Sequence, residues 1–100
     1  MTTPKKNDTP TWAALEAKVR KIAAAIWGVP CVAETISGVR IDGICRITPE
    51  RFVLVEVTER RDLDKVRTDI LKLDTCRRAF AADSIFAECY MVTDEEPTSD

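Results

Sequence analysis

Three β-rich runs follow one another in the middle of the chain, and only short turns separate them. The runs are CVAETI (31–36), VRIDGICRI (39–47) and FVLVEVT (52–58), with the turn-forming segments SG (37–38) and TPER (48–51) between them. Connections of this length cannot hold a crossover, so consecutive strands are expected to pair antiparallel. The sequence therefore predicts an antiparallel meander of three strands.

A helix is predicted before the meander, in the segment TWAALEAKVRKIAAAIWGVP that begins at Thr11. Its apolar residues recur at steps of four, three and four, which is the helical period: Leu15, Val19, Ile22 and Ile26. Thr11 can cap the start, Gly28 suits the left-handed position after the last turn, and Pro30 prevents continuation.

A second helix is predicted from about Asp62 to Ala81, and a fourth strand follows in SIFAECYMVT (84–93). Because this helix is a crossover, the third and fourth strands are expected to be parallel neighbours joined by a right-handed connection. The predicted order is αβββαβ. The fold class is α/β (α+β), with a mixed four-stranded sheet flanked by two helices.

Length and composition limit the chemistry. One hundred residues make a single small domain. The chain has no histidine, which excludes histidine-based catalytic triads, and its four cysteines lack the short spacings of a zinc site. Chemistry must therefore come from carboxylates, lysines, hydroxyls or thiols, with an added metal.

The chain divides into a leader (1–10), the domain (11–93) and an acidic segment (94–100) that is expected to be a linker to downstream domains of the same chain. The domain has 13 basic and 12 acidic residues, so a strongly basic nucleic-acid surface is not evident. No apolar run approaches the ~20 residues that cross a bilayer, and the leader lacks the apolar region of a signal peptide. A cytoplasmic location with no membrane partner is expected.

Two acidic residues lie on the second and third predicted strands, Asp42 in VRIDG and Glu56 in VLVEVT. Glu56 faces the same way as Phe52 and Leu54, so its face is expected to be at least partly covered, where an unpaired carboxylate is costly. Two carboxylates on neighbouring strands suit a divalent cation such as Mg²⁺, which prefers hard oxygen ligands. Asp42 and Glu56 are therefore the leading site candidates.

The element order and these two acids resemble the core of the PD-(D/E)XK nuclease superfamily, the restriction-endonuclease-like fold. In that family an aspartate on the second strand and a Glu-x-Lys on the third meet at the edge of the sheet, often with a glutamate from the first helix. The resemblance implies a nuclease that cleaves DNA with Mg²⁺ or Mn²⁺. It implies Asp42 and Glu56 as metal ligands and Glu16 as the helix carboxylate.

Thr58 stands where the family has its lysine, and a hydroxyl can donate one hydrogen bond but carries no charge. Two lysines of the second predicted helix, Lys65 and Lys72, are seven residues apart and share a face, so a relocated lysine is one hypothesis. Lys65 is assigned to the catalytic group with Thr58, although it is expected to flank the sheet. Arg60 and Arg61, just past the strand, are the candidates for phosphate contact.

Each candidate also has an ordinary structural interpretation. Glu56 could be a solvated outward side chain, and Asp42, which precedes a glycine, could belong to an Asp-Gly turn. Glu16 could be an exposed helix residue, and Arg60 and Arg61 a solvated charged surface.

Three functions remain open from the sequence. The first is a nuclease domain, the N-terminal effector or accessory domain of a larger bacterial protein with a role in defence. The second is a catalytically inactive member of the same fold that serves protein association, a homodimer included, or weak nucleic-acid binding. The third is an unrelated αβ interaction domain.

Overall fold

The computed structural model describes residues 12–58 and 62–93, which form two helices and four strands. In chain order these are α1 (Trp12–Trp27), β1 (Cys31–Ile36), β2 (Val39–Thr48), β3 (Arg51–Thr58), α2 (Leu63–Ala82) and β4 (Phe86–Thr93). The predicted αβββαβ order is confirmed. The fourth strand begins two residues later than predicted because Ser84 has a φ of 63° in the turn after α2. The proposed cap Thr11 lies outside the described residues.

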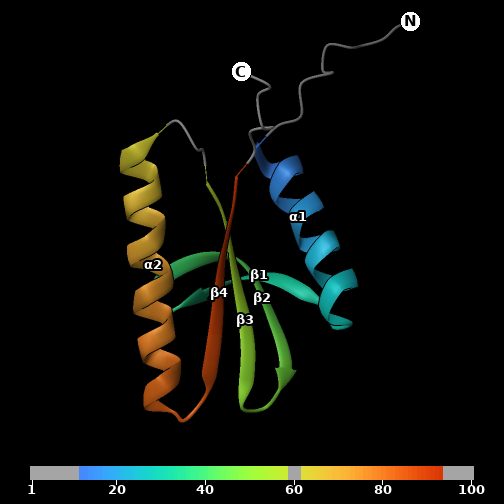
Figure 1. The fold of residues 1–100 in the computed structure, drawn as a ribbon, viewed down its shortest axis with the longest axis vertical. Helices are drawn as coiled ribbons and strands as arrows, with labels where there is room; N and C mark the ends of the chain where they lie inside the picture. Colours follow the sequence, from blue (N-terminus) through green and yellow to red (C-terminus); the bar gives the residue numbers. More distant parts are fainter. Residues whose placement is uncertain (1–11, 59–61, 94–100) are drawn as a thin grey trace, which may run out of the picture.

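The strands form a mixed sheet in the order β1-β2-β3-β4. The first three pair antiparallel and β3 pairs parallel with β4, as the turn lengths and the crossover helix predicted. The two helices lie on opposite faces of the sheet, so the described part of the chain has three layers (Figure 1). Neither described helix is both long and apolar enough to span a membrane.

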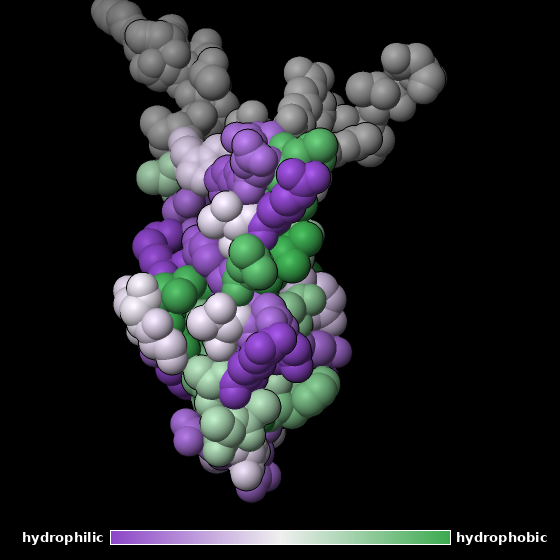
Figure 2. Space-filling model, turned by 90° about the vertical axis from the view of Figure 1, so that its left-hand side faces the viewer, coloured by the Kyte–Doolittle hydropathy of each residue, from purple (hydrophilic) through white to green (hydrophobic). Residues whose placement is uncertain are grey.

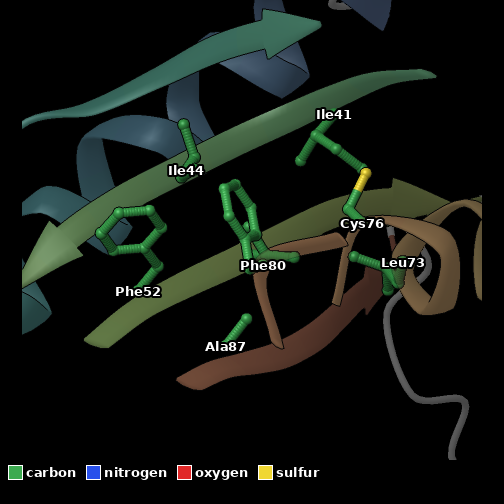
Figure 3. Close-up of a cluster of buried hydrophobic side chains, with 8 residues drawn as sticks. Ile41, Ile44, Phe52, Leu73, Cys76, Phe80 and Ala87 are labelled. Atoms are coloured by element: carbon green, nitrogen blue, oxygen red, sulfur yellow. The ribbon is translucent and has the colours of Figure 1, made fainter. Parts of the chain in front are cut away.

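β3 is buried on both faces because alternate side chains meet different helices. Phe52 and Leu54 join a core cluster with Leu73 and Phe80 of α2 (Figure 3). The intervening residues Val53, Val55 and Val57 pack with Val19 and Ala23 of α1 in a second cluster. Positions 56 and 58 continue the face that α2 covers, and both are completely buried. The prediction that Glu56 shares a covered face with Phe52 and Leu54 is confirmed.

β2 is irregular at Asp42 and Gly43. Its register with β1 shifts between Val32 and Glu34, opposite this point, while its ladder with β3 includes the pair Gly43 and Val55. Asp42 and Gly43 lie within β2, so the interpretation of Asp42 as part of a tight turn is wrong. The chain continues through this point as a strand. The ladder between β2 and β3 ends at the pair Gly43 and Val55, so residues 39–42 of β2 have no ladder partner on β3.

We expect Gly43→Ala to destabilise the protein, because a Cβ at this position would lie 2.7 Å from the Sγ atom of Cys31. The cost of such overpacking is about 1–3 kcal/mol in the free energy of unfolding. Urea unfolding of Gly43→Ala, Cys31→Ala and the double variant measures it. Cys31→Ala removes the obstructing sulfur, so the double variant should lose less stability than the sum of the single variants. Additive losses would contradict the contact.

Candidate functional site

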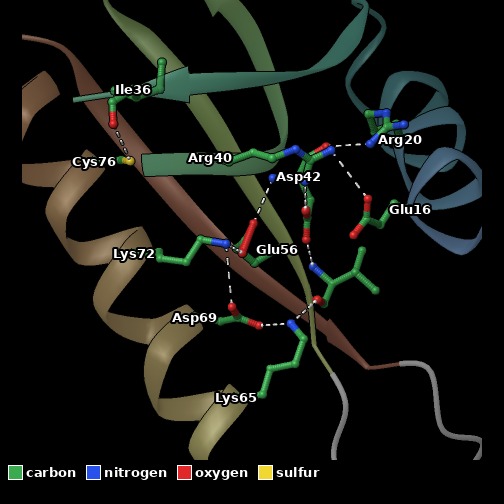
Figure 4. A network of polar contacts seen from close by, with 11 residues as sticks. Glu16, Arg20, Ile36, Arg40, Asp42, Glu56, Lys65, Asp69, Lys72 and Cys76 are labelled. Atoms are coloured by element: carbon green, nitrogen blue, oxygen red, sulfur yellow. Dashed lines mark hydrogen bonds and ion pairs between the residues drawn. The ribbon is translucent and has the colours of Figure 1, made fainter. Parts of the chain in front are cut away.

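Two acidic side chains take over the hydrogen bonding where β2 separates from β3. The Val57 N–H donates to Oδ2 of Asp42 at 2.8 Å, and the Asp42 N–H donates to Oε2 of Glu56 at 2.8 Å (Figure 4). Each carboxylate thus satisfies a main-chain N–H of the opposite strand, which would otherwise be buried without a partner. Asp42 is 4% exposed and Glu56 is fully buried. Each acid therefore bonds the main chain of the other strand, while its remaining oxygen pairs with a cation: Asp42 with Arg40, which contacts Glu16 of α1, and Glu56 with Lys72 of α2.

Helix α2 places a row of alternating charges beside this point. The Nζ atom of Lys72 lies 2.7 Å from Oε1 of Glu56 and 3.8 Å from Oδ1 of Asp69. The Nζ atom of Lys65 lies 2.7 Å from the other oxygen of Asp69. Spacings of four and three residues put these three side chains on one face of the helix. A chain of charges therefore runs from Glu56 through Lys72 and Asp69 to Lys65, with both acids buried and both lysines partly exposed.

The lysine that reaches Glu56 is Lys72. Lys65 instead donates to the Val57 carbonyl at 3.2 Å and to Asp69, and its ammonium lies over the Trp12 ring, 5.4 Å from the ring centroid. Seven residues of helix separate the lysines by about 10 Å along the axis, which brings Lys72 alongside the carboxylate. Sequence reasoning considered Lys72 but chose Lys65. The Lys-x₃-Asp-x₂-Lys spacing was the available signal, and Asp69 was missed entirely.

A second cation approaches Asp42 from the other side. The Nη1 atom of Arg40 donates to Oδ1 of Asp42 at 2.6 Å, and Nη1 of Arg20 on α1 donates to the Asp42 carbonyl at 2.9 Å. Glu16, the predicted third metal ligand, lies 3.5 Å from Arg40. Glu16 is therefore linked to Asp42 through a guanidinium and does not converge directly on the two acids. Neither Arg20 nor Arg40 was identified from the sequence.

Burial and charge act in opposite directions on Glu56. Burial raises the pKa of Glu56 to about 7, helped by the nearby Asp42 charge, while Lys72 and the Asp42 N–H lower it. Burial lowers the pKa of Lys72, but Glu56 and the two aspartates outweigh that effect and raise it overall. At neutral pH, Lys72 is therefore charged and Glu56 is close to its titration midpoint.

Two buried oxygens on the α2 face of β3 lack a hydrogen-bond partner among the described residues: Oε1 of Glu56 and Oγ1 of Thr58. The first lies 2.7 Å from the Lys72 ammonium, which is an ion-pair distance. Only Oγ1 of Thr58 therefore has neither a hydrogen bond nor an ion pair among the described residues, and such buried polar atoms are rare.

Asp42 and Glu56 have the chemistry of a magnesium site, because Mg²⁺ is usually held by one or two carboxylates together with waters and substrate phosphate. No group of three or more acidic or thiol side chains within residues 12–58 and 62–93 is arranged to hold a metal. Each of the four carboxylate oxygens already lies beside a donor or a cation, so Mg²⁺ or Mn²⁺ would have to displace Arg40 from Asp42 or Lys72 from Glu56. Arg60 and Arg61, the predicted phosphate contacts, lie outside the described residues.

We expect Lys72→Met to destabilise the protein by about 3–5 kcal/mol above neutral pH, because it leaves a buried carboxylate without its cation. Adding Glu56→Gln should recover much of this loss, since the amide carries no charge. Lys18→Met, at an exposed position of α1, is the matched control and should change stability by less than about 0.5 kcal/mol. Chemical unfolding measures all four proteins. Equal losses in the single and double variants would exclude the ion pair as the cause.

The pKa of Glu56 also predicts a pH dependence of stability. The folded protein holds this proton more tightly than the unfolded chain, so the contribution is complete below pH 4.5 and is lost as pH rises through about 7. The wild type should therefore lose about 1–3 kcal/mol relative to Glu56→Gln across this range. Unfolding curves of both proteins at stepped pH test it. A constant difference between the two would contradict the raised pKa.

Comparison of the chain with family models, with curated proteins and with solved structures finds no match.

Proposed function

We propose that this chain is a metal-dependent nuclease domain of the PD-(D/E)XK type, with the restriction-endonuclease-like fold, that hydrolyses DNA. The observation that carries the proposal is the position of Glu56, which accepts from the Asp42 main-chain N–H of β2 and pairs with Lys72 of α2. Two hard carboxylates and one ammonium are the groups that phosphodiester hydrolysis needs near the scissile phosphate. The proposed setting is the N-terminal part of a larger bacterial protein, with a role in defence.

Asp42 and Glu56 would hold Mg²⁺ or Mn²⁺. When bound, such an ion polarises a phosphoryl oxygen and lowers the pKa of a coordinated water. Lys72 replaces the lysine that the family carries at the position of Thr58, and its ammonium supplies positive charge for the developing phosphate charge. Asp69 holds that ammonium from the far side, at 3.8 Å. The Thr58 hydroxyl, which has no partner among the described residues, is free to donate one hydrogen bond.

A second candidate function is a catalytically inactive module of the same fold. It is favoured because the Asp42 carboxylate already has its hydrogen-bond donors within the protein: Arg40 donates to one oxygen and the Val57 N–H to the other. An arrangement that is already neutralised needs no cation to be stable. In that case the charge chain serves to hold α2 against β3, and the domain works through its surfaces.

Cleavage of DNA by the purified chain with Mg²⁺ or Mn²⁺ tests the first function. Asp42→Asn and Glu56→Gln should abolish cleavage, and Lys72→Met should lower the rate about 10²–10³-fold, as expected for one electrostatic stabiliser. Lys65→Met should have a smaller effect because Lys65 does not contact Glu56 in the structure. Lys18→Met is again the control. Wild-type activity in the Asp42 or Glu56 variants would refute the assignment.

Metal binding separates the two candidates even when no substrate is found. In an amide NMR titration with Mg²⁺, the signals of Asp42, Glu56 and Val57 should shift, and Glu56→Gln should remove the shifts. Binding should strengthen as pH rises through about 7, because the carboxylate must lose its proton to become a ligand. Unchanged spectra at saturating Mg²⁺ and Mn²⁺ would favour the inactive module.

A further inference from the structure

Two cysteines face each other across the ladder between β1 and β2. Cys31 is the first residue of β1 and pairs in register with Cys45 of β2. Directly opposed residues of an antiparallel pair have Cα atoms about 4.5–5.5 Å apart and side chains on the same face of the sheet. A disulfide needs a Cα separation of about 4.4–6.8 Å. The backbone therefore already holds the two residues at the separation that a disulfide bond requires.

The Cys31 side chain also points toward β2. Both cysteines belong to the apolar cluster on the α1 face of the sheet. A Cβ added to Gly43 would lie 2.7 Å from the Sγ atom of Cys31, and Gly43 is two residues from Cys45 on the same strand. Side chains two residues apart share a face, so the Cys31 sulfur lies over the face of β2 that carries the Cys45 thiol. The two thiols hydrogen-bond to each other, with Cys45 as the donor.

The other two cysteines are not strand partners. Cys76 of α2 and Cys89 of β4 belong to the cluster on the opposite face, on the α2 side of the molecule, where Figure 2 shows apolar patches among the charged side chains. Their thiols bond to separate main-chain carbonyls, Cys76 to that of Ile36 at 3.8 Å and Cys89 to that of Leu73 at 4.0 Å. They are therefore an internal comparison for the pair on the α1 face.

The thiols of Cys31 and Cys45 differ in access and in acidity. Cys31 is half-buried, whereas Cys45 is completely buried. Burial raises the pKa of both thiols, that of Cys45 to about 12, while the hydrogen bond from Cys45 and the nearby Arg20 charge act to lower the pKa of Cys31. The thiolate is the nucleophilic form of cysteine. Cys31 is therefore the thiol that ionises first and that a small solute can reach, and Cys45 lies behind it.

We propose that Cys31 and Cys45 are an oxidation site, at which hydrogen peroxide converts the two thiols to a reversible cross-strand disulfide. A small oxidant is required because only Cys31 is partly exposed and its sulfur lies against Gly43. Redox-sensing cysteines are commonly placed next to a second thiol that resolves the first oxidation product. Cys45 has that position here.

The reaction takes two steps and releases two waters. The Cys31 thiolate attacks one peroxide oxygen, so an S–O bond forms and the O–O bond breaks. The leaving hydroxide takes up the proton that Cys31 lost, which gives water and a sulfenic acid on Cys31. The Cys45 sulfur then attacks the Cys31 sulfur, so the S–S bond forms, the S–O bond breaks and hydroxide leaves with the Cys45 proton as the second water. Two electrons pass from the two sulfurs to the peroxide.

The disulfide would fasten the strand of the sheet that is held least firmly. β1 is at an end of the sheet, pairs only with β2 among the described strands, and contains no buried residue. Its ladder with β2 shifts register between Val32 and Glu34, soon after Cys31. A bond from Cys31 to Cys45 closes the loop between the two residues and restricts the unfolded chain. Oxidation is therefore expected to stabilise β1, and this effect depends on neither metal binding nor catalysis.

Mass spectrometry of the 100-residue chain after treatment with hydrogen peroxide tests the proposal. The native protein should lose the mass of two hydrogens, and peptide mapping should find Cys31 linked to Cys45, with Cys76 and Cys89 still reduced. Dithiothreitol should restore the original mass. Cys45→Ser should stop at the sulfenic acid, which dimedone traps on Cys31. The double variant Cys76→Ser/Cys89→Ser is the matched control and should form the disulfide at the wild-type rate.

Urea unfolding and amide hydrogen exchange then measure the effect of the bond. The oxidised protein should unfold at a urea concentration about 1–2 M higher than the reduced protein. The amides of β1 should exchange more slowly after oxidation, while those of β3 should change little.

The mapping of the wild-type chain needs no substitution, so it decides the proposal even if a serine variant fails to fold. A native chain that keeps Cys31 and Cys45 unlinked, under conditions that oxidise the pair in denaturant, would overturn it. So would a first disulfide that contains Cys76 or Cys89, a disulfide between two chains, or an oxidised form that is less stable than the reduced one.

Discussion

The structure depends on an exchange of hydrogen-bond partners at the point where β2 leaves β3. The ladder between β2 and β3 ends at the pair Gly43 and Val55. Without another acceptor, the N–H groups of Asp42 and Val57 would be buried unpaired. The carboxylates of Asp42 and Glu56 accept from these groups instead, each from the opposite strand. Because each carboxylate accepts a hydrogen bond from the main chain of the opposite strand, the two side chains are fixed in orientation. Preorganised groups of this kind are what a binding or catalytic site requires.

The same exchange explains the charges that surround it. A carboxylate that is fully buried must be neutralised, hydrogen-bonded or protonated, and Glu56 combines all three: the Lys72 ammonium, the Asp42 N–H and a pKa raised to about 7. Asp69 and Lys65 continue the row of alternating charges along α2. A buried ion pair is weak evidence for stability, since apolar residues of similar volume often do as well.

The site and the β4 edge of the sheet occupy different parts of the fold. The charged site around Asp42 and Glu56 lies where β2 separates from β3. Arg40 and Arg20 contact Asp42 from the side of α1, and Lys72 contacts Glu56 from α2 (Figure 4). Two grooves flank β4 at the end of the sheet, and only the one on the α1 face has wholly apolar walls.

The sequence by itself determined the order of the elements and the way the strands pair. Short turns between residues 31 and 58 allow only antiparallel neighbours, and the helix after Asp62 requires a crossover to a parallel one. Period-two alternation also placed Glu56 on the face of Phe52 and Leu54. These features follow from local geometry, because turn length and side-chain alternation are fixed within a few residues.

Tertiary structure alone decided which charges meet. The choice of Lys72 over Lys65 as the partner of Glu56 depends on how far α2 lies along the sheet. That offset is set by the packing of Leu73 and Phe80 against β3, many residues away in the chain. No local pattern encodes such a distance, because a helix advances about 1.5 Å per residue and a strand about 3.3 Å, and only their packed register relates the two.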